Sequence, residues 1–140
     1  MNKTDLAYFA GIIDGEGSIM LYRDKQRRTF MRVMVGNTNE WLINQLCFSF
    51  GGVKNVTCQY HLIWKPCWHW SIHGSKAVEF LKLILPYLKL KRAQAEIAIR
   101  FQERKSKARK YGKSHPKSDE AYALEEAELI LSKSLNKRGR

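Results

Sequence analysis

The stretch that decides the fold is Leu6-Ala7-Tyr8-Phe9-Ala10-Gly11-Ile12-Ile13-Asp14-Gly15-Glu16-Gly17-Ser18. Its small residues Ala7, Gly11 and Gly15 recur every fourth position, which places them on one face of a helix. Glycine inside a helix costs about 1 kcal/mol relative to alanine, so the repetition favours close approach by a second helix. The stretch ends in Asp14 and Glu16, although the helix dipole disfavours acids at a C-terminus. Carboxylates in that place indicate a cation.

Length and composition predict a single soluble domain. A chain of 140 residues, 44% of them hydrophobic, suits one domain with one core. No apolar run approaches the roughly 18 residues of a membrane span, and the first residues lack the apolar stretch of a signal peptide. We therefore expect an intracellular protein with no membrane partner. The three cysteines are odd in number and suggest no disulfide framework, which fits a reducing compartment.

The charge balance is strongly basic. There are 25 Lys and Arg against 13 Asp and Glu, a net charge of +12. The basic residues concentrate in 23–32, 89–92 and 104–117, whereas acids cluster in 120–128. Such clustering is typical of nucleic-acid binders, and it disfavours the plainer alternative of an evenly solvated basic surface.

The hydrophobic pattern predicts an αββαββα order followed by a tail. The expected elements are a helix capped by Thr4 or Asp5 that ends near Asp14, strands 18–25 and 29–35 around a loop at 24–28, a helix begun by 37–40 and ended by 51–52, strands 53–60 and 67–73, a helix begun by 74–75 and closed by Pro86, and a long helix from about Leu88 with Leu90, Ala93, Ile97 and Phe101 on one face. Residues 104–118 read as a basic linker, and 119–140 as a C-terminal helix of the same domain.

Residues 9–17, Phe9-Ala10-Gly11-Ile12-Ile13-Asp14-Gly15-Glu16-Gly17, resemble the signature of the LAGLIDADG homing endonucleases. The resemblance covers the chain to about residue 103. It implies an α+β fold in which a curved antiparallel sheet forms a DNA-binding saddle. It also implies a site-specific endonuclease that cuts both strands of a long pseudo-palindromic DNA target by metal-dependent phosphodiester hydrolysis. A non-catalytic nucleic-acid binder, such as an intron RNA maturase or a DNA-binding regulator, is the alternative on the same fold.

The resemblance places the catalytic metal at the end of the motif. Glu16 is implied as the metal-binding acid, the Gly15 carbonyl assists it, and Asp14 holds the helix end. The implied metal is Mg²⁺, which prefers hard oxygen ligands. Mn²⁺ is expected to substitute for it, and Ca²⁺ to support binding without cleavage. The plainer alternative is that Asp14 and Glu16 merely form a turn.

Two further catalytic assignments rest on the same resemblance. Lys91 follows the Pro86-Tyr87-Leu88 segment and matches the family's active-site lysine, which polarises the attacking water or stabilises phosphate charge. Lys89 is the second choice, and both lysines could instead grip phosphates. Asn37 matches an amide that orders solvent around the metals, a role compatible with capping the next helix.

Strand alternation selects the side chains that would read DNA, because a two-stranded ribbon fits the major groove. The candidates on the strands and in the first hairpin loop, with one lysine beyond them, are Ser18, Tyr22, Asp24, Gln26, Arg27, Arg28, Phe30, Arg32, Met34, His69, Ser71 and Lys89. Half or more of such contacts typically go to phosphate rather than to bases.

An active site at a seam between two motif helices requires two motifs, and this chain has one. We therefore expect a two-fold symmetric homodimer with Ala7, Ala10, Gly11, Asp14 and Gly15 at the interface. A third hypothesis is a zinc-stabilised binding module that uses Cys58, His61, Cys67 and His69. Structural zinc sites prefer two to four residues between paired ligands, and the first pair alone fits.

Overall fold

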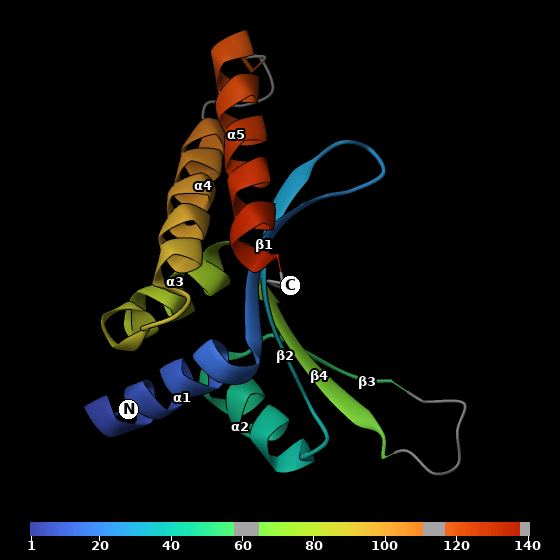
Figure 1. Ribbon diagram of the computed structural model, residues 1–140, viewed down its shortest axis with the longest axis vertical. Coiled ribbons are helices and arrows are strands. Elements are labelled where there is room, and N and C mark those ends of the chain that lie inside the picture. Colours follow the sequence, from blue (N-terminus) through green and yellow to red (C-terminus); the bar gives the residue numbers. More distant parts are fainter. Residues whose placement is uncertain (58–64, 111–116, 138–140) are drawn as a thin grey trace.

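The computed structural model describes residues 1–57, 65–110 and 117–137. Its elements are α1 (Lys3–Glu16), β1 (Gly17–Arg23), β2 (Thr29–Asn37), α2 (Glu40–Phe50), β3 (Val53–Thr57), β4 (Cys67–His73), α3 (Gly74–Ile84), the 3₁₀ turn η1 (Leu85–Tyr87), α4 (Arg92–Lys110) and α5 (Asp119–Asn136). The strands form one antiparallel sheet in the order β1-β2-β4-β3. The helices lie on one side of this sheet, and its two ends curve away from them (Figure 1). The predicted α+β saddle is thus confirmed.

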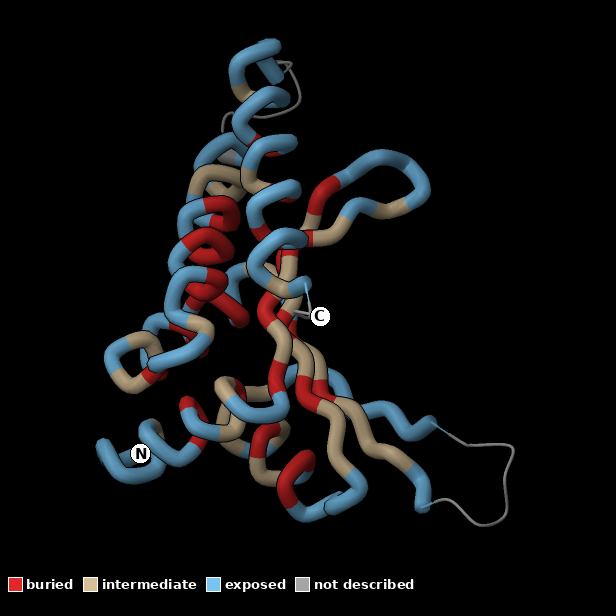
Figure 2. Tube along the Cα trace, viewed as in Figure 1, coloured by how far each residue is buried: buried red, intermediate tan, exposed pale blue. Residues whose placement is uncertain are grey.

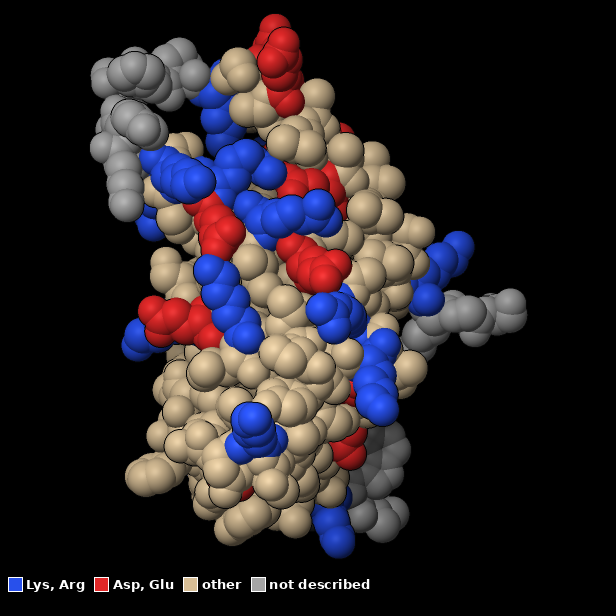
Figure 3. All heavy atoms as spheres, turned by 90° about the vertical axis from the view of Figure 1, so that its left-hand side faces the viewer, with Lys and Arg blue, Asp and Glu red and all other residues tan. Residues whose placement is uncertain are grey.

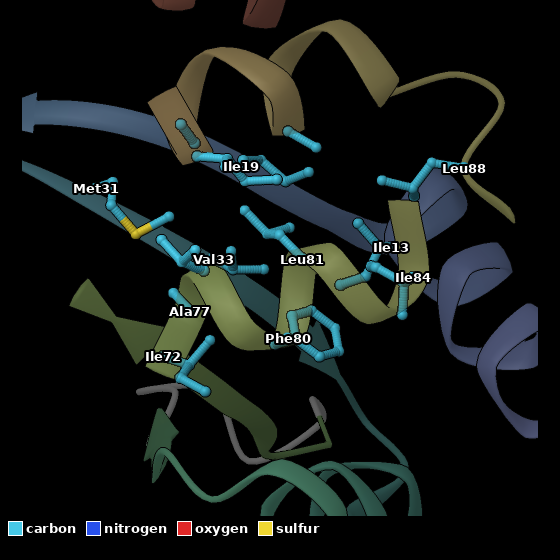
Figure 4. Packing of buried hydrophobic residues seen from close by; sticks show 14 of the residues in the cluster. Ile13, Ile19, Met31, Val33, Ile72, Ala77, Phe80, Leu81, Ile84 and Leu88 are labelled. Atoms are coloured by element: carbon cyan, nitrogen blue, oxygen red, sulfur yellow. The ribbon is translucent and has the colours of Figure 1, made fainter. Parts of the chain in front are cut away.

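The core lies between the helices and one face of the sheet. Alternate strand residues such as Ile19, Met31 and Val33 are buried against Leu81 and Ile84 of α3 (Figure 4). Figure 2 shows the consequence: burial runs along the middle of the sheet and the inner faces of the helices, while the end of the β1–β2 hairpin is exposed. Burying one such aliphatic side chain contributes about 1.5–3 kcal/mol, so this layer fixes which face of each strand points outward.

The signature segment forms α1 and the corner that leads into the sheet. The helix is capped by Asn2, whose side chain and that of Asp5 form a reciprocal capping box, rather than by Thr4 or Asp5 as predicted. It runs to Glu16, two residues beyond the predicted end. A Cβ atom on Gly17 would lie 2.8 Å from the Cα atom of Ile13. Glycine at that position therefore lets the chain turn from helix to strand without a spacer.

The segment between α3 and α4 differs from its prediction. Pro86 lies inside a 3₁₀ turn, and α4 begins at Arg92 instead of near Leu88. Leu90 is 75% exposed, so it does not belong to the apolar face of α4 as predicted. The cause is a distant contact, since the Asp14 carboxylate accepts the backbone N–H groups of residues 89–91.

The C-terminal end of α4 also differs from its prediction. The helix continues to Lys110, so the first part of the predicted 104–118 linker is helical.

The C-terminal helix α5 packs on the same domain. The Ser132 hydroxyl accepts the Leu21 N–H at 3.1 Å, and the Asn136 amide donates to the Ile19 carbonyl at 2.8 Å. These bonds cover the outer edge of β1, an exposed row of backbone groups that would otherwise invite strand pairing. No helix within the described ranges combines the length and hydrophobicity needed to cross a membrane.

Candidate active site and nucleic-acid interface

The C-terminal end of α1 brings two predicted catalytic residues into contact. The Asn37 amide donates from Nδ2 to Glu16 Oε2 at 2.5 Å. Its other end is fixed, because Asn37 Oδ1 accepts the Asn39 backbone N–H at 2.7 Å just before α2 begins. With the amide oxygen committed to Asn39, the NH₂ group must face the carboxylate. Asn37 therefore orients Glu16 and at the same time helps to start α2.

Lys91 occupies the end of the same helix. Its ammonium donates to the carbonyls of Ile13 at 2.9 Å, Asp14 at 3.0 Å and Gly17 at 2.5 Å. A cation there offsets the negative end of the helix dipole directly beside the motif acids. Burial lowers the pKa of the Lys91 ammonium, and the Asp14 carboxylate acts in the opposite direction.

Asp14 in turn binds the backbone of the segment that contains Lys91. Its carboxylate accepts the backbone N–H groups of Lys89 at 2.8 Å, Leu90 at 3.1 Å and Lys91 at 3.0 Å. Asp14 thus holds the chain just before α4. The Lys89 side chain is exposed, whereas that of Lys91 is half-buried.

The carboxylate of Glu16 and the carbonyl of Gly15 are oxygen ligands that suit a hard cation, whose other ligands would come from outside the chain. Glu16 is exposed, and the predicted Gly15 carbonyl is not among the acceptors of Lys91. Across the described ranges, no three His, Cys, Asp or Glu residues gather as a metal cluster. Magnesium needs no such cluster, because waters and substrate phosphates complete one or two carboxylates. For the zinc hypothesis, Cys67 and His69 share the outward side of β4, while Cys58 and His61 lie outside the described residues.

The sheet face turned away from the helices gathers the predicted DNA-reading side chains of the strands. The register places Ser18, Met34 and Ser71 in one row and Tyr22 beside Phe30, all on this open face. Among the described strand residues with outward side chains, none is Asp or Glu. An open, curved face without carboxylates suits a polyanion.

Arg32 lies near the middle of this face and is pre-positioned. Its guanidinium lies 4.8 Å from the centre of the Tyr22 ring, and Nη2 contacts the Met20 sulfur at 3.3 Å. Its Nε–H is buried and has no partner within the described chain. An arginine held in place with donors to spare fits the recognition of phosphate or guanine. The predicted set omitted Met20, Asn55 and His73, although the same strand alternation places them on this face.

In the first hairpin loop, residues 24–28, some side chains stabilise the turn and others are exposed to solvent. Asp24 Oδ1 accepts the backbone N–H groups of Gln26 at 2.9 Å and Arg28 at 2.8 Å. The Arg28 backbone N–H is the main reason that the pKa of Asp24 lies below its usual value. Asp24 therefore shapes the turn, while Gln26 and Arg27 project from an exposed tip.

Comparison with known proteins identifies the architecture. No protein-family model and no curated protein matches the chain. The homing endonuclease I-CvuI, in complex with its target in the presence of 2 mM Ca, aligns with a TM-score of 0.73 at 15% identity over 98% of this chain and 85% of its own. The archaeal intron-encoded homing endonuclease I-Vdi141I, complexed with DNA, aligns with a TM-score of 0.75 at 12% identity over 98% of this chain and 87% of its own. This chain has the LAGLIDADG homing-endonuclease fold.

A further comparison bears on the size of the LAGLIDADG unit. The meganuclease I-SmaMI, bound to uncleaveable DNA, aligns with a TM-score of 0.63 at 15% identity. The alignment covers 99% of this chain and 47% of the I-SmaMI chain, so this chain spans about half of that one.

The small-residue face of α1 in this LAGLIDADG fold is turned outward. Ala7, Gly11 and Gly15 are exposed, and a Cβ atom added to Gly11 or Gly15 would meet no atom of the described residues within 4 Å. Packing within the described part of the chain therefore gives no reason for either glycine. Ala10 is fully buried in the chain's own core, so its predicted place at a dimer interface is wrong. Asp14 is half-buried and engaged with residues 89–91.

The helix side carries its charges unevenly. Lys and Arg alternate with Asp and Glu over the upper part of this side, where α4 and α5 lie, and much of the lower part is uncharged (Figure 3). Pairs such as Lys82–Glu103 and Arg104–Glu128 account for this mixture. Acids and bases therefore offset one another over this part of the helix side.

Proposed function

We propose that the protein is a site-specific DNA endonuclease that cleaves both strands by metal-dependent phosphodiester hydrolysis. The observation that carries the proposal is the contact of Asn37 with Glu16, where β1 begins and β2 ends. That contact holds an exposed carboxylate at the end of a sheet whose open face presents no Asp or Glu among its described strand residues. The fold shared with DNA-bound homing endonucleases supports the same conclusion.

Each residue of the site has a distinct task in this proposal. Glu16, with the Gly15 carbonyl, would hold Mg²⁺, which when bound activates water and offsets phosphate charge. Asn37 keeps the carboxylate in one orientation and leaves its second oxygen free. Lys91 holds the helix end beside Glu16, and Lys89 extends a mobile cation toward the phosphates. Mn²⁺ should substitute for Mg²⁺, and Ca²⁺ should support binding alone.

The active enzyme is proposed to be a homodimer joined through Ala7, Gly11 and Gly15. One chain supplies one available motif carboxylate, and cutting two strands needs one for each. The exposed glycines support the dimer, since each costs about 1 kcal/mol in a helix and packing within the chain does not require them. A two-fold dimer suits a pseudo-palindromic DNA target.

DNA contact is proposed along the open face and through the tip at Gln26 and Arg27. Contacts with many phosphates should make binding fall steeply with salt concentration. The sheet side chains would read base edges, with Arg32 as the central anchor because it is already held by Tyr22.

The decisive experiment selects DNA sites from a randomised pool in Ca²⁺ and then transfers them to Mg²⁺. Wild type is compared with Glu16→Gln, which keeps the shape of the side chain and removes its charge. We expect both proteins to bind the selected site and wild type alone to cut both strands. Sites that wild type binds but never cuts would refute the nuclease and leave a binder, such as a maturase or regulator. Equal cleavage by Glu16→Gln would remove Glu16 from the site.

A further inference from the structure

The β1–β2 hairpin extends beyond the rest of the sheet. β4 pairs with β2 from Arg32 to Asn37, so residues 29–31 pair with β1 alone in the described sheet. Figure 1 shows this ribbon leaving the helices and reaching out on the open side. A two-stranded ribbon is marginally stable in water unless it packs against another element. The direction of this ribbon therefore depends on the contacts that hold it beyond Arg32.

Lys105 of α4 holds the second strand at Thr29, where the loop begins. Its ammonium donates to the backbone carbonyl of Thr29 at 2.6 Å and lies 3.9 Å from the centre of the Phe30 ring. Burial and the neighbouring Arg109 lower the pKa of Lys105. The Lys105 ammonium is thus partly buried and already bound to the ribbon. A lysine whose role is to bind phosphate would instead be exposed to solvent.

Two acidic residues of α5 contact the ribbon at the same place, the pair Arg23 and Thr29. The Glu125 side chain is 10% exposed, and its carboxylate accepts the Lys117 ammonium at 2.6 Å and the Thr29 hydroxyl. Glu126 pairs with Arg23 at 2.6 Å. Arg23 and Thr29 face each other across the hairpin. Contacts from α4 and α5 thus meet at the pair of residues where the loop begins.

We propose that Lys105 is a positioning residue, which sets the direction of the β1–β2 ribbon and thereby the bases that the 24–28 loop reads. The inference rests on the proposed function. The loop begins about 10 Å beyond Arg32, at roughly 3.3 Å per strand residue. A rotation of the ribbon by about 10° around Arg32 would move the start of the loop by about 2 Å, which is enough to break a hydrogen bond between the loop and a nucleotide base. Lys105 acts on DNA through the ribbon and touches none itself.

The test uses the full-length protein and the DNA site that wild type selects. Gln26→Ala first identifies the base pairs that the loop reads, because its exposed side chain makes no hydrogen bond within the described chain. Lys105→Met is then compared with Lys105→Arg, which retains the cation and its donors. Each variant is measured for base preference at every position, for the salt dependence of binding and for thermal midpoint.

We expect Lys105→Met to lose about tenfold discrimination at the base pairs that Gln26→Ala identifies, and to keep it at the central base pairs. Lys105→Arg should restore the preference. The slope of log K against log salt should stay unchanged, because a lysine that contacts phosphate would lower it by about one. A lower slope with an unchanged base profile would overturn the proposal, and so would an equal loss at all positions with a lower thermal midpoint.

Glu126→Gln keeps the test decisive if Lys105→Met fails to fold. The Glu126 side chain is 50% exposed, so its loss should not endanger the fold. It should relax preference at the same base pairs to a smaller degree, and an unchanged profile would overturn the proposal. Failure of wild type to select any site would refute the proposed function, whereas selection with Lys105-independent preferences would refute this inference alone.

Discussion

Replacing both exposed glycines of α1 by alanine should separate the stability of one chain from the stability of the dimer. Among the residues that the structure describes, none lies within 4 Å of a Cβ atom at Gly11 or Gly15, so the substitution strains no described contact. Each change gains about 1 kcal/mol of helix propensity, or about 2 kcal/mol together. Unfolding entropy near 2.1 cal/mol/K per residue gives about 0.3 kcal/mol/K for 140 residues. The melting temperature of the isolated chain should therefore rise by about 7 °C.

The same substitution should weaken the proposed dimer. Two methyl groups on each chain place four in a two-fold seam, and overpacking costs about 1–3 kcal/mol for each misfit. Even about 1 kcal/mol per methyl raises the dissociation constant about a thousandfold. The double variant should be a more stable monomer with little cleavage activity.

The assay is sedimentation equilibrium across a range of protein concentrations, with thermal melts below the dissociation constant of wild type. Ser134→Ala on α5 is the control, because this exposed residue lies outside α1 and its change also raises helix propensity. The control should dimerise and cleave like wild type. A double variant that gains stability and still dimerises and cleaves normally would refute the seam. A double variant that loses stability as a monomer would refute the claim that packing within the chain does not require these glycines.

Three further outcomes follow from contacts in and around the site. Asp14→Ala should lower the free energy of unfolding by about 2–4 kcal/mol in denaturant titrations, because three N–H groups lose a charged acceptor; a loss well below 1 kcal/mol would contradict this. Lys89→Met should reduce the salt slope of DNA binding by about one with an unchanged melting temperature, whereas Lys91→Met should lower the melting temperature; equal melting temperatures would contradict the difference. Burial alone would raise the pKa of Glu125, but bonds from Lys117 and Thr29 hold it below its ordinary 4.5. Its contribution is therefore present above that pH and is lost as the pH falls through the lowered value, so melts of wild type and Glu125→Gln should converge in acid.

The order of elements could be predicted because local patterns determine it. Alternation placed Ile19 and Leu21 inward and Tyr22 outward, and burial in the structure confirms these faces. Gly51 and Gly52 correctly marked the end of α2. The same alternation located the open face, because successive side chains of a strand point to opposite faces. Once the buried residues are known, the residues between them must point outward.

The errors arise where distant residues override local preference. Residues 88–91 have a helical pattern, yet Asp14 accepts the N–H groups of residues 89–91 and α4 begins only at Arg92. Ala10 shares the small size of the seam residues, but its angular position on α1 points into the core. The role of α5 could not be read from composition, because its bonds to β1 join Ser132 and Asn136 to backbone groups more than a hundred positions away.

The arrangement of Asp14 and Lys91 explains why the motif and the lysine segment were both informative in the sequence. Asp14 at the end of α1 binds the backbone of 89–91, and Lys91 binds the backbone of 13–17 in return. Each segment therefore helps to fix the geometry of the other. Glu16 is the last residue of α1 and lies between the residues that Lys91 binds. The hydrogen bond from Asn37 orients its carboxylate. A carboxylate at the unfavourable end of a helix is thus tolerated because the half-buried ammonium of Lys91 offsets the helix dipole there.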